Sequence, residues 1–194
     1  MPLHQQRRGR ERAERHRLIV DAARALAEAE GWAAVTTRRL SERVAYSQPV
    51  LYSHFTGMEA IVTAVAAQGI EELTTALRTA RTGAAGPAEG LAALAAAYLA
   101  FARAHPALYE AMFVRRTALE FATEDSPAIL KAAFAEFLHV VGPLAGGRAP
   151  GTLAELVWST LHGLATLEGS DRLLPDLAEG RLKLLVNTVV SGGR

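Results

Sequence analysis

Cysteine is absent from the 194 residues, so the chain has no disulfide frame and no thiolate metal site. Long apolar runs are missing as well. The longest strongly apolar stretch, residues 91–102, is well short of the roughly 18 residues that span a bilayer. The Arg-rich N-terminus has no apolar signal region beside it. We therefore expect a soluble, cytoplasmic protein that holds no metal and no cofactor.

Strand signals are also scarce. No stretch alternates Val, Ile, Thr or aromatic residues with polar ones, and Ala and Leu dominate. The chain is therefore predicted to be all-α. Glycine and proline clusters divide it into about nine helices. These include a first helix over about 8–30, two short segments that end near Val44 and His54, a long helix over 56–81, and two last helices over 152–169 and 176–190.

The charges are unevenly placed, although the net charge is only +1. Residues 1–55 hold ten Arg and six acidic residues, whereas residues 56–194 hold eleven basic and fourteen acidic residues. Counterion release favours Arg and Lys where nucleic acid lies. A basic head on a mildly acidic body thus predicts a phosphate-binding module joined to an unrelated one. The alternative is a solvated basic tail.

Residues 37–54 have the pattern of a helix-turn-helix. Apolar residues at helical spacing, Leu40 and Val44 and then Leu51 and Phe55, are expected to face inward. Gln48, Pro49 and Val50 cluster at the start of the second helix and are expected to point outward. Proline is tolerated only in the first turn of a helix, so Pro49 after a Ser47 cap fixes where this helix begins.

The same region resembles the DNA-binding head of the TetR family of regulators. The likeness rests on Gly31-Trp32, Thr36-Thr37, Ser47, Leu51-Tyr52-Ser53-His54-Phe55 and Glu59, in the family's order and intervals. It implies phosphate contacts from Thr37 and Ser47, base contacts from residues 48–50, and backbone contacts from Tyr52 and His54. The predicted DNA-binding residues are Arg7, Arg8, Thr36, Thr37, Arg38, Ser47, Gln48, Pro49, Val50, Tyr52 and His54.

Three positions depart from the family's pattern. Ala45, followed by Tyr46, stands in the turn where glycine is usual, so the turn must accept a side chain. Pro49 replaces a frequent glycine. Met58 replaces the usual lysine and removes a phosphate contact, although free backbone amides there can still meet a phosphate.

A cluster of Arg7, Arg8, Arg10 and Arg12 precedes the apolar stripe of the expected first helix. It resembles the minor-groove or backbone arms of other helix-turn-helix proteins. We therefore divide the chain into a DNA-binding domain with a basic arm, residues 1–55, and a body, residues 56–194.

The body is expected to form the homodimer and to sense a ligand. A helix-turn-helix monomer reads few bases, so two-fold pairing of the last two helices is predicted. Trp158, His162 and Gly163 resemble a signature of one group of TetR C-terminal domains. A small apolar ligand that shifts the long helix would release the operator, as the resemblance implies. The predicted ligand-binding residues are Phe101, Tyr109, Met112, Phe113, Phe137, Trp158 and His162.

Catalytic motifs are missing, so we expect that the protein is not an enzyme. There is no His-Glu-x-x-His, no Gly-x-Ser-x-Gly and no phosphate loop ending in Gly-Lys. One alternative is a helical enzyme in which His105, Glu110 and His162 meet in the fold. The other is a helix-turn-helix adaptor whose body binds a protein partner.

Overall fold

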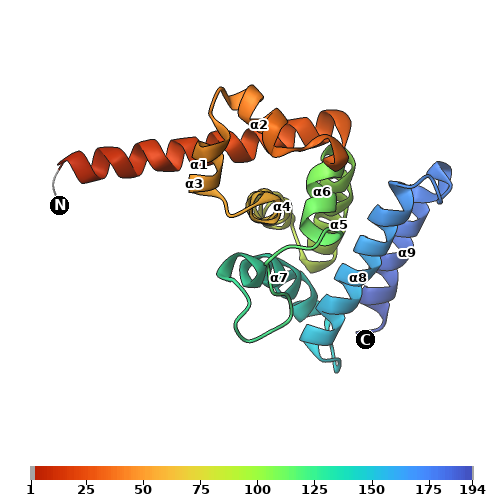
Figure 1. The fold of residues 1–194 in the computed structure, drawn as a ribbon. Coiled ribbons are helices and arrows are strands. Elements are labelled where there is room, and N and C mark those ends of the chain that lie inside the picture. The colour runs from red at the N-terminus through yellow and green to blue at the C-terminus, as the bar shows by residue number, and fades with distance from the viewer. Residues whose placement is uncertain (1–2, 194) are drawn as a thin grey trace. The chain divides into compact units, whose positions relative to one another are not determined.

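The computed structural model describes residues 3–193. Over this range it has nine α-helices, three short 3-10 helices and no strand (Figure 1). The prediction of an all-α chain with about nine helices is confirmed. The elements are α1 (Leu3–Glu30), η1 (Trp32–Ala34), α2 (Thr37–Val44), α3 (Gln48–His54), α4 (Met58–Thr82), α5 (Pro87–Ala104), α6 (Pro106–Phe113), α7 (Ala128–Val141), η2 (Gly142–Leu144), α8 (Pro150–Glu168), η3 (Pro175–Leu177) and α9 (Ala178–Ser191).

The helices form two compact units. The N-terminal unit contains the residues up to Gly69 together with Pro106–Leu119. The C-terminal unit contains Ile70–His105 and the residues from Glu120 onward. Helix α4 therefore contributes to both units, and α6 belongs to the N-terminal unit although it follows α5 in the sequence. The functional division after residue 55 remains a prediction, because this grouping concerns packing alone.

The core of the N-terminal unit is built from apolar residues at helical spacing. Ile19, Ala23 and Leu26 recur on one face of α1 and are buried. Of the inward positions expected on and after the two short helices, Leu40, Leu51 and Phe55 are buried, whereas Val44 is half-buried. The local apolar pattern thus decides which faces of α2 and α3 stay outside.

Helix α1 begins at Leu3, several residues before its predicted start. The Arg-rich segment that we interpreted as an arm is itself helical. Arg, Gln and Glu are good helix formers, and Arg7 Nε lies 3.4 Å from the Glu11 carboxylate one turn further along. The basic cluster is therefore carried on a helix and not on an extended arm.

Three other helices begin two residues from their predicted starts. Helix α4 begins at Met58, α8 at Pro150 and α9 at Ala178. A proline in the first turn has its φ already set and lacks an amide that would otherwise go unbonded there. Pro150 therefore starts α8 ahead of Thr152. The short η3 occupies the residues before α9.

The core of the C-terminal unit lies among α5, α7 and α8, which pack against one another. Tyr98 of α5 is fully buried, and its ring meets the Phe137 ring of α7 edge-on at a centroid distance of 6.0 Å. Val157 and Leu161 of α8 are fully buried too. Large apolar side chains thus fill the centre of this unit.

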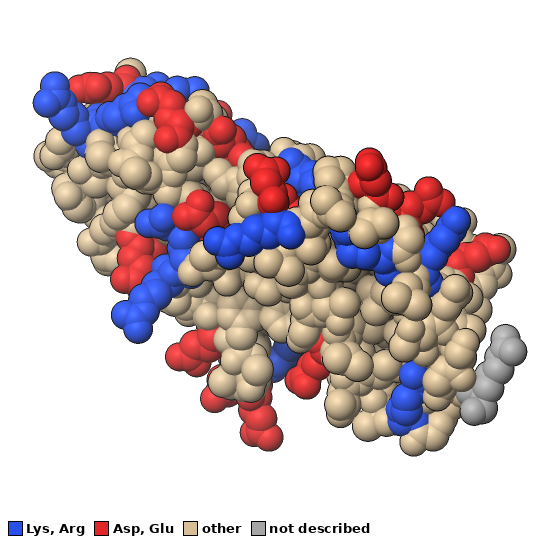
Figure 2. Space-filling view, turned by 90° about the vertical axis from the view of Figure 1, so that its right-hand side faces the viewer, with Lys and Arg blue, Asp and Glu red and all other residues tan. Residues whose placement is uncertain are grey.

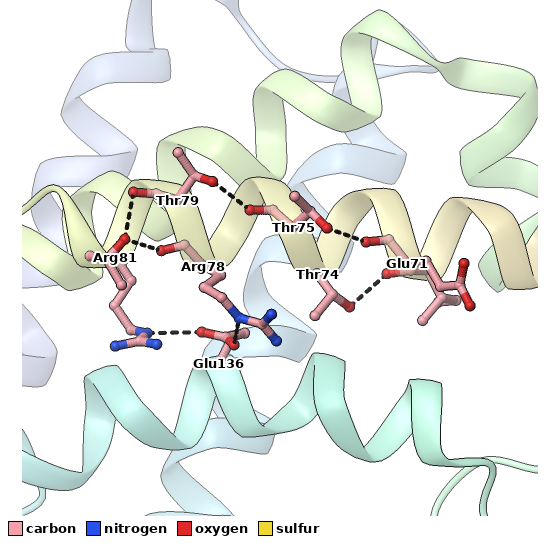
Figure 3. A network of polar contacts seen from close by, with 9 residues as sticks. Glu71, Thr74, Thr75, Arg78, Thr79, Arg81 and Glu136 are labelled. Atoms are coloured by element: carbon pink, nitrogen blue, oxygen red, sulfur yellow. Dashed lines mark hydrogen bonds and ion pairs between the residues drawn. The ribbon is translucent and has the colours of Figure 1, made fainter.

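A buried carboxylate joins α7 to the end of α4 within the C-terminal unit (Figure 3). Glu136 is only 2% exposed, and it accepts hydrogen bonds from Arg78 Nε and Arg81 Nε, each at 2.8 Å. Burial by itself opposes ionisation of Glu136. The hydrogen bonds and charges of the two arginines outweigh burial, so its pKa is lowered. Glu136 is therefore a charged anchor between two helices.

Two features are missing from the part of the chain that the structure describes. No single helix there is long and apolar enough to span a membrane. Two pairs of consecutive helices meet the length and hydropathy criteria only when the two helices of a pair are taken together, and each pair is strongly bent at its break. No three His, Asp or Glu side chains in the same range gather closely enough to hold a metal ion.

Candidate DNA-binding site

Helix α2 is capped by Thr36. The Thr36 side-chain oxygen accepts a hydrogen bond from the Arg39 amide at 3.2 Å, which satisfies one of the free N–H groups of the first turn. The Arg39 guanidinium in turn donates to both carboxylate oxygens of Glu30 at 2.7 and 2.8 Å. This hydrogen bonding is the main reason that the pKa of Glu30 is lowered. Thr36 and Arg39 thus hold the start of α2 beside the end of α1.

Two other residues that we predicted to contact phosphate lie on the first turn of α2. Thr37 is half-buried, whereas Arg38 is exposed and pairs with Glu42 at 3.0 Å one helical turn away. An exposed pair of this kind contributes little to stability. Arg38 therefore keeps its freedom to pair with another anion.

The turn between α2 and α3 requires a left-handed residue. Ala45 ends α2 with φ 55° and ψ 35°, and its amide donates to the Ser41 carbonyl. This conformation costs about 1–2 kcal/mol for a residue with a Cβ. The turn thus accepts a side chain in place of glycine, as expected, and the backbone at Ala45 is strained.

Helix α3 presents its first turn to solvent. Ser47 stands at the N-cap position, but its side chain makes no capping hydrogen bond, and Pro49 lies in the first turn as expected. Gln48 and Pro49 are exposed and Val50 is half-buried, while Leu51 behind them is fully buried. A short helix held by one buried leucine thus leaves residues 48–50 facing outward.

Two aromatic residues follow on the last turn of α3. Tyr52 is 53% exposed, and His54 is half-buried with no hydrogen-bond partner for its buried Nδ1. The pKa of His54 is lowered, mainly by burial and further by the nearby positive charges of Arg12, His16 and Arg15. His54 is therefore neutral near pH 7 and is suited to donate a hydrogen bond instead of supplying a charge.

The middle of the exposed part of α1 touches the end of α3. Arg12 Nη2 donates to the Ser53 carbonyl at 3.4 Å, and the His16 ring lies over the Phe55 ring at a centroid distance of 4.4 Å. Arg12 was grouped with the basic cluster in the sequence, but its position beside α3 was not foreseen. The spacing of Arg8, Arg12, Arg15 and Ile19 along one helix face was the signal that would have found it.

The predicted ligand-binding residues are divided between the two units. Phe101 and Phe137 are buried in the C-terminal unit, where Trp158 and His162 are half-buried. Burial lowers the pKa of His162. The remaining three belong to the N-terminal unit and lie on α6: Tyr109, Met112 and Phe113. A ligand site made of all seven stays a prediction.

A groove of about 430 Å³ lies on the N-terminal unit, between the start of α4 and the end of α6. None of the predicted ligand-binding residues lines it. Its lining comprises Met58, Glu59, Val62, Glu110, Val114, Arg115 and Arg116. Met58, which stands where the family usually has lysine, therefore contributes to this groove.

The last two helices expose leucines. Leu156 of α8 is 62% exposed and Leu184 of α9 is 68% exposed, and only Val189 is buried on α9. Figure 2 views the molecule from the side on which α8 and α9 lie in Figure 1, and a broad area of that face carries no charged side chain. Exposed leucines beside an uncharged area of this kind often mark an interface.

Two family models match the chain. Residues 19–65 match the bacterial regulatory proteins of the tetR family, and residues 91–189 match the tetracyclin repressor-like C-terminal domain. The first match covers the helix-turn-helix, and the second alone covers half of the chain.

Curated relatives carry similar descriptions. The chain is 30% identical over 152 residues to the HTH-type transcriptional regulator Rv0681 of Mycobacterium tuberculosis, covering 77% of this chain and 68% of that protein. It is 34% identical over 99 residues to the HTH-type transcriptional regulator YobS of Bacillus subtilis. The second match spans 51% of each protein, about half the length of that relative.

Solved structures share the fold. A protein from Rhodococcus sp. RHA1 matches with a TM-score of 0.73 at 24% identity, over 91% of this chain and 94% of that one. The transcriptional regulator FadR from Bacillus subtilis, solved in complex with stearoyl-CoA, matches with a TM-score of 0.63 at 14% identity, over 87% of this chain and 96% of that one. At these identities the likeness concerns the fold alone.

Proposed function

The chain belongs to the TetR family of bacterial regulatory proteins, and from that membership we propose that it is a sequence-specific transcriptional regulator, not an enzyme, that binds double-stranded operator DNA as a homodimer in the cytoplasm. One observation carries this proposal. Gln48 and Pro49 in the first turn of α3 are exposed beside a buried Leu51, and Pro49 defines the start of the helix. A recognition helix must present its N-terminal side chains in this way.

Base contacts are assigned to the first turn of α3. The Gln48 amide has both a donor and an acceptor, which suits the paired groups on an adenine edge in the major groove. Pro49 and Val50 supply apolar contacts, of which the thymine methyl group is the natural partner. These three residues would therefore supply the sequence preference.

Phosphate contacts are assigned to the residues around them. Thr37, Arg38 and Ser47 lie near the starts of α2 and α3, where free amides also favour an anion. Tyr52 and His54 lie at the other end of α3, and Thr36 belongs to this set although its oxygen already caps α2. Contacts of this kind position the protein without reading sequence.

Dimer formation is assigned to α8 and α9. Two recognition helices on half-sites about 34 Å apart need a two-fold partner. Leu156 and Leu184 lie on helices that expose apolar surface, and pairing them with their copies would bury it in a four-helix interface. Burial on dimerisation explains why leucine, not a charged residue, occupies these positions.

Regulation by a small apolar ligand is the second part of the proposal. The C-terminal unit offers aromatic and histidine side chains, including Phe101, Trp158 and His162, and a neighbour of the same fold was solved with stearoyl-CoA. Because α4 contributes to both units, a ligand that favours one position of α4 would change the spacing of the two recognition helices. A difference of a few kcal/mol between two spacings is enough to release the operator.

Selection from genomic DNA tests this function. The purified full chain is incubated with sheared genomic fragments, and bound fragments are sequenced. Enrichment of a two-fold symmetric site is expected, and acyl-CoA thioesters and other apolar compounds are then screened for release of that site. If no sequence is enriched over random fragments, the chain is not a sequence-specific regulator. If a site is enriched but only a protein partner releases it, the body is an adaptor instead of a ligand sensor.

A further inference from the structure

The first four turns of α1 carry a large excess of positive charge. Residues 5–18 are all exposed and contain six Arg against two Glu. Helices without tertiary packing are marginal in water, and Gly9 weakens this one further. Within it, Arg12 and His16 contact Ser53 and Phe55, so further support for the turns before Arg12 would have to come from a partner.

The charges fall on two different faces. Arg8, Arg12 and Arg15 are separated by four and three residues, so they share one face of the helix. The same face continues into Ile19 and Ala23, which are buried in the core. We call Arg8, Arg12 and Arg15 the near face. Glu11 flanks this face, three residues after Arg8 and four before Arg15, but its carboxylate is paired with Arg7.

The opposite face is mixed. Arg10, Glu14 and Arg17 lie on it at the same spacing, so an acidic residue stands between the two arginines. Arg7 is paired with Glu11 along the helix. We call Arg10 and Arg17 the far face. Each face is thus flanked by one glutamate, and the near face carries three arginines against two on the far face.

The near face is directed toward the recognition helix. Arg12 Nη2 donates to the Ser53 carbonyl at the end of α3, and the His16 ring packs on the Phe55 ring directly after it. Figure 1 shows α1 continuing past α3 toward the N-terminus. The arginines that precede Arg12 thus lie beyond the end of α3 on an element that contacts it.

We propose that the near face binds the phosphate backbone of the same DNA duplex, next to the bases that α3 reads. The inference rests on the proposed function and assigns the contact to one helix face. From Arg8 to Arg15 the helix rises about 10 Å, or roughly three base-pair steps of 3.4 Å. The contact therefore lengthens the protein's footprint on DNA. Arg7, which we predicted to bind DNA, lies off this face.

A membrane surface is the less suitable polyanion. A helix that binds a bilayer needs an apolar face opposite its charges, and between residues 5 and 17 the only apolar side chain is Ala13. Phosphates along a duplex require only a row of cations at regular spacing. DNA is therefore the partner that fits this helix.

Two double variants of equal charge and equal spacing test the proposal. Arg8→Gln with Arg15→Gln removes two near-face cations and leaves the Arg12 contact in place. Arg10→Gln with Arg17→Gln removes two far-face cations as the matched control. Affinity of the full-length protein for a genomic fragment that it selects is measured between about 50 and 200 mM salt, with far-ultraviolet circular dichroism to check folding.

Affinity falls as salt rises, so the slope of log affinity against log salt is negative. In the near-face variant this slope is expected to be less steep by about 1.8, since each phosphate contact contributes about 0.9. Wild type would then lose about tenfold more affinity than this variant over that salt range. The control slope is expected to remain close to that of wild type. A hydroxyl-radical footprint shortened on its outer side by the near-face variant alone would support the same contact.

Equal slopes for the two variants would overturn the inference while leaving the proposed function intact. Binding of the near face to phosphatidylserine vesicles, with unchanged DNA slopes, would overturn it as well. If the wild-type protein has no sequence preference on DNA, the proposed function is wrong. That outcome is measured on the wild-type protein alone, so it is distinct from a failure of the near-face inference.

Discussion

The indole Nε1 of Trp32 donates a buried hydrogen bond to the Ala107 carbonyl at 2.8 Å, across 75 residues of sequence. The Glu28 carboxylate completes the junction by accepting from the amides of Ala107 and Leu108 at 3.1 and 3.0 Å. A carboxylate at a helix N-terminus is stabilising. The start of α6 is therefore bound to the end of α1 and to η1, and it moves with the DNA-binding helices.

Replacing Trp32 by Phe removes this donor and leaves the Ala107 carbonyl without it. We expect a loss of about 1–3 kcal/mol in unfolding free energy, the usual cost of a buried polar group that loses its partner. Urea denaturation measures it.

Hydrogen exchange at Ala107 and Leu108 should also quicken in a Glu28→Gln variant. Unchanged stability and exchange would show that the junction does not hold α6.

Replacing Ala45 by Gly should stabilise the chain. Ala45 is held at φ 55°, where glycine avoids a steric cost of about 1–2 kcal/mol but loses more backbone entropy on folding. A net gain of about 0.5–1 kcal/mol is expected in urea denaturation. The control Ala25→Gly, at an exposed helical position of α1, should lose about 1 kcal/mol. A destabilised Ala45→Gly would refute the strained turn.

Replacing Glu136 by Gln should destabilise the C-terminal unit in a pH-dependent way. Two arginines would lose their buried counter-charge, and we expect a loss of about 2–4 kcal/mol near pH 7. This is less than for a fully buried pair, because the Arg78 side chain is 56% exposed. The folded-state pKa of Glu136 is lowered, so its contribution is complete above the unfolded value of about 4.3.

That contribution is lost as pH falls through the folded-state pKa. The difference in unfolding free energy between wild type and Glu136→Gln should therefore narrow as the pH falls below about 5. Thermal or urea unfolding at several pH values measures it. A difference that stays constant over this range would show that Glu136 is not held as a charged anchor.

Replacing Leu184 by Glu should dissociate the dimer. A carboxylate at the centre of an apolar interface is desolvated without a partner, which costs several kcal/mol. Analytical ultracentrifugation should find a monomer for Leu184→Glu and a dimer for wild type. Val114→Glu, at an equally exposed apolar residue of the N-terminal unit, is the control and should remain dimeric. Dimerisation of both variants would place the interface elsewhere.

Local rules predicted much of the helix-turn-helix. The buried positions of Leu40, Leu51 and Phe55 follow from helical spacing, and Pro49 marks the start of α3 because proline fits only the first turn. These features depend on neighbours within a few residues, which the sequence displays directly.

Other features depend on contacts between distant segments. Nothing near Trp32 indicates that its partner is Ala107, and nothing near α6 assigns it to the N-terminal unit. The charges of the first turns of α1 were interpreted as an arm because they resemble the basic arms of other helix-turn-helix proteins, whereas the spacing of Arg8, Arg12 and Arg15 continues the buried stripe of Ile19. Ser47 lies at the predicted cap position without making the cap hydrogen bond, since residue type alone does not fix a side-chain rotamer.

The most direct measurement is the ratio of specific to non-specific DNA affinity for Gln48→Ala, with Gln6→Ala as the control. Both glutamines are exposed, but only Gln48 lies on the first turn of α3. Loss of a bidentate base contact should lower the ratio roughly 5- to 150-fold, which corresponds to about 1–3 kcal/mol of binding free energy. The dependence of affinity on salt should not change. The ratio for Gln6→Ala should equal that of wild type. An unchanged ratio for Gln48→Ala would contradict the reading of DNA by α3.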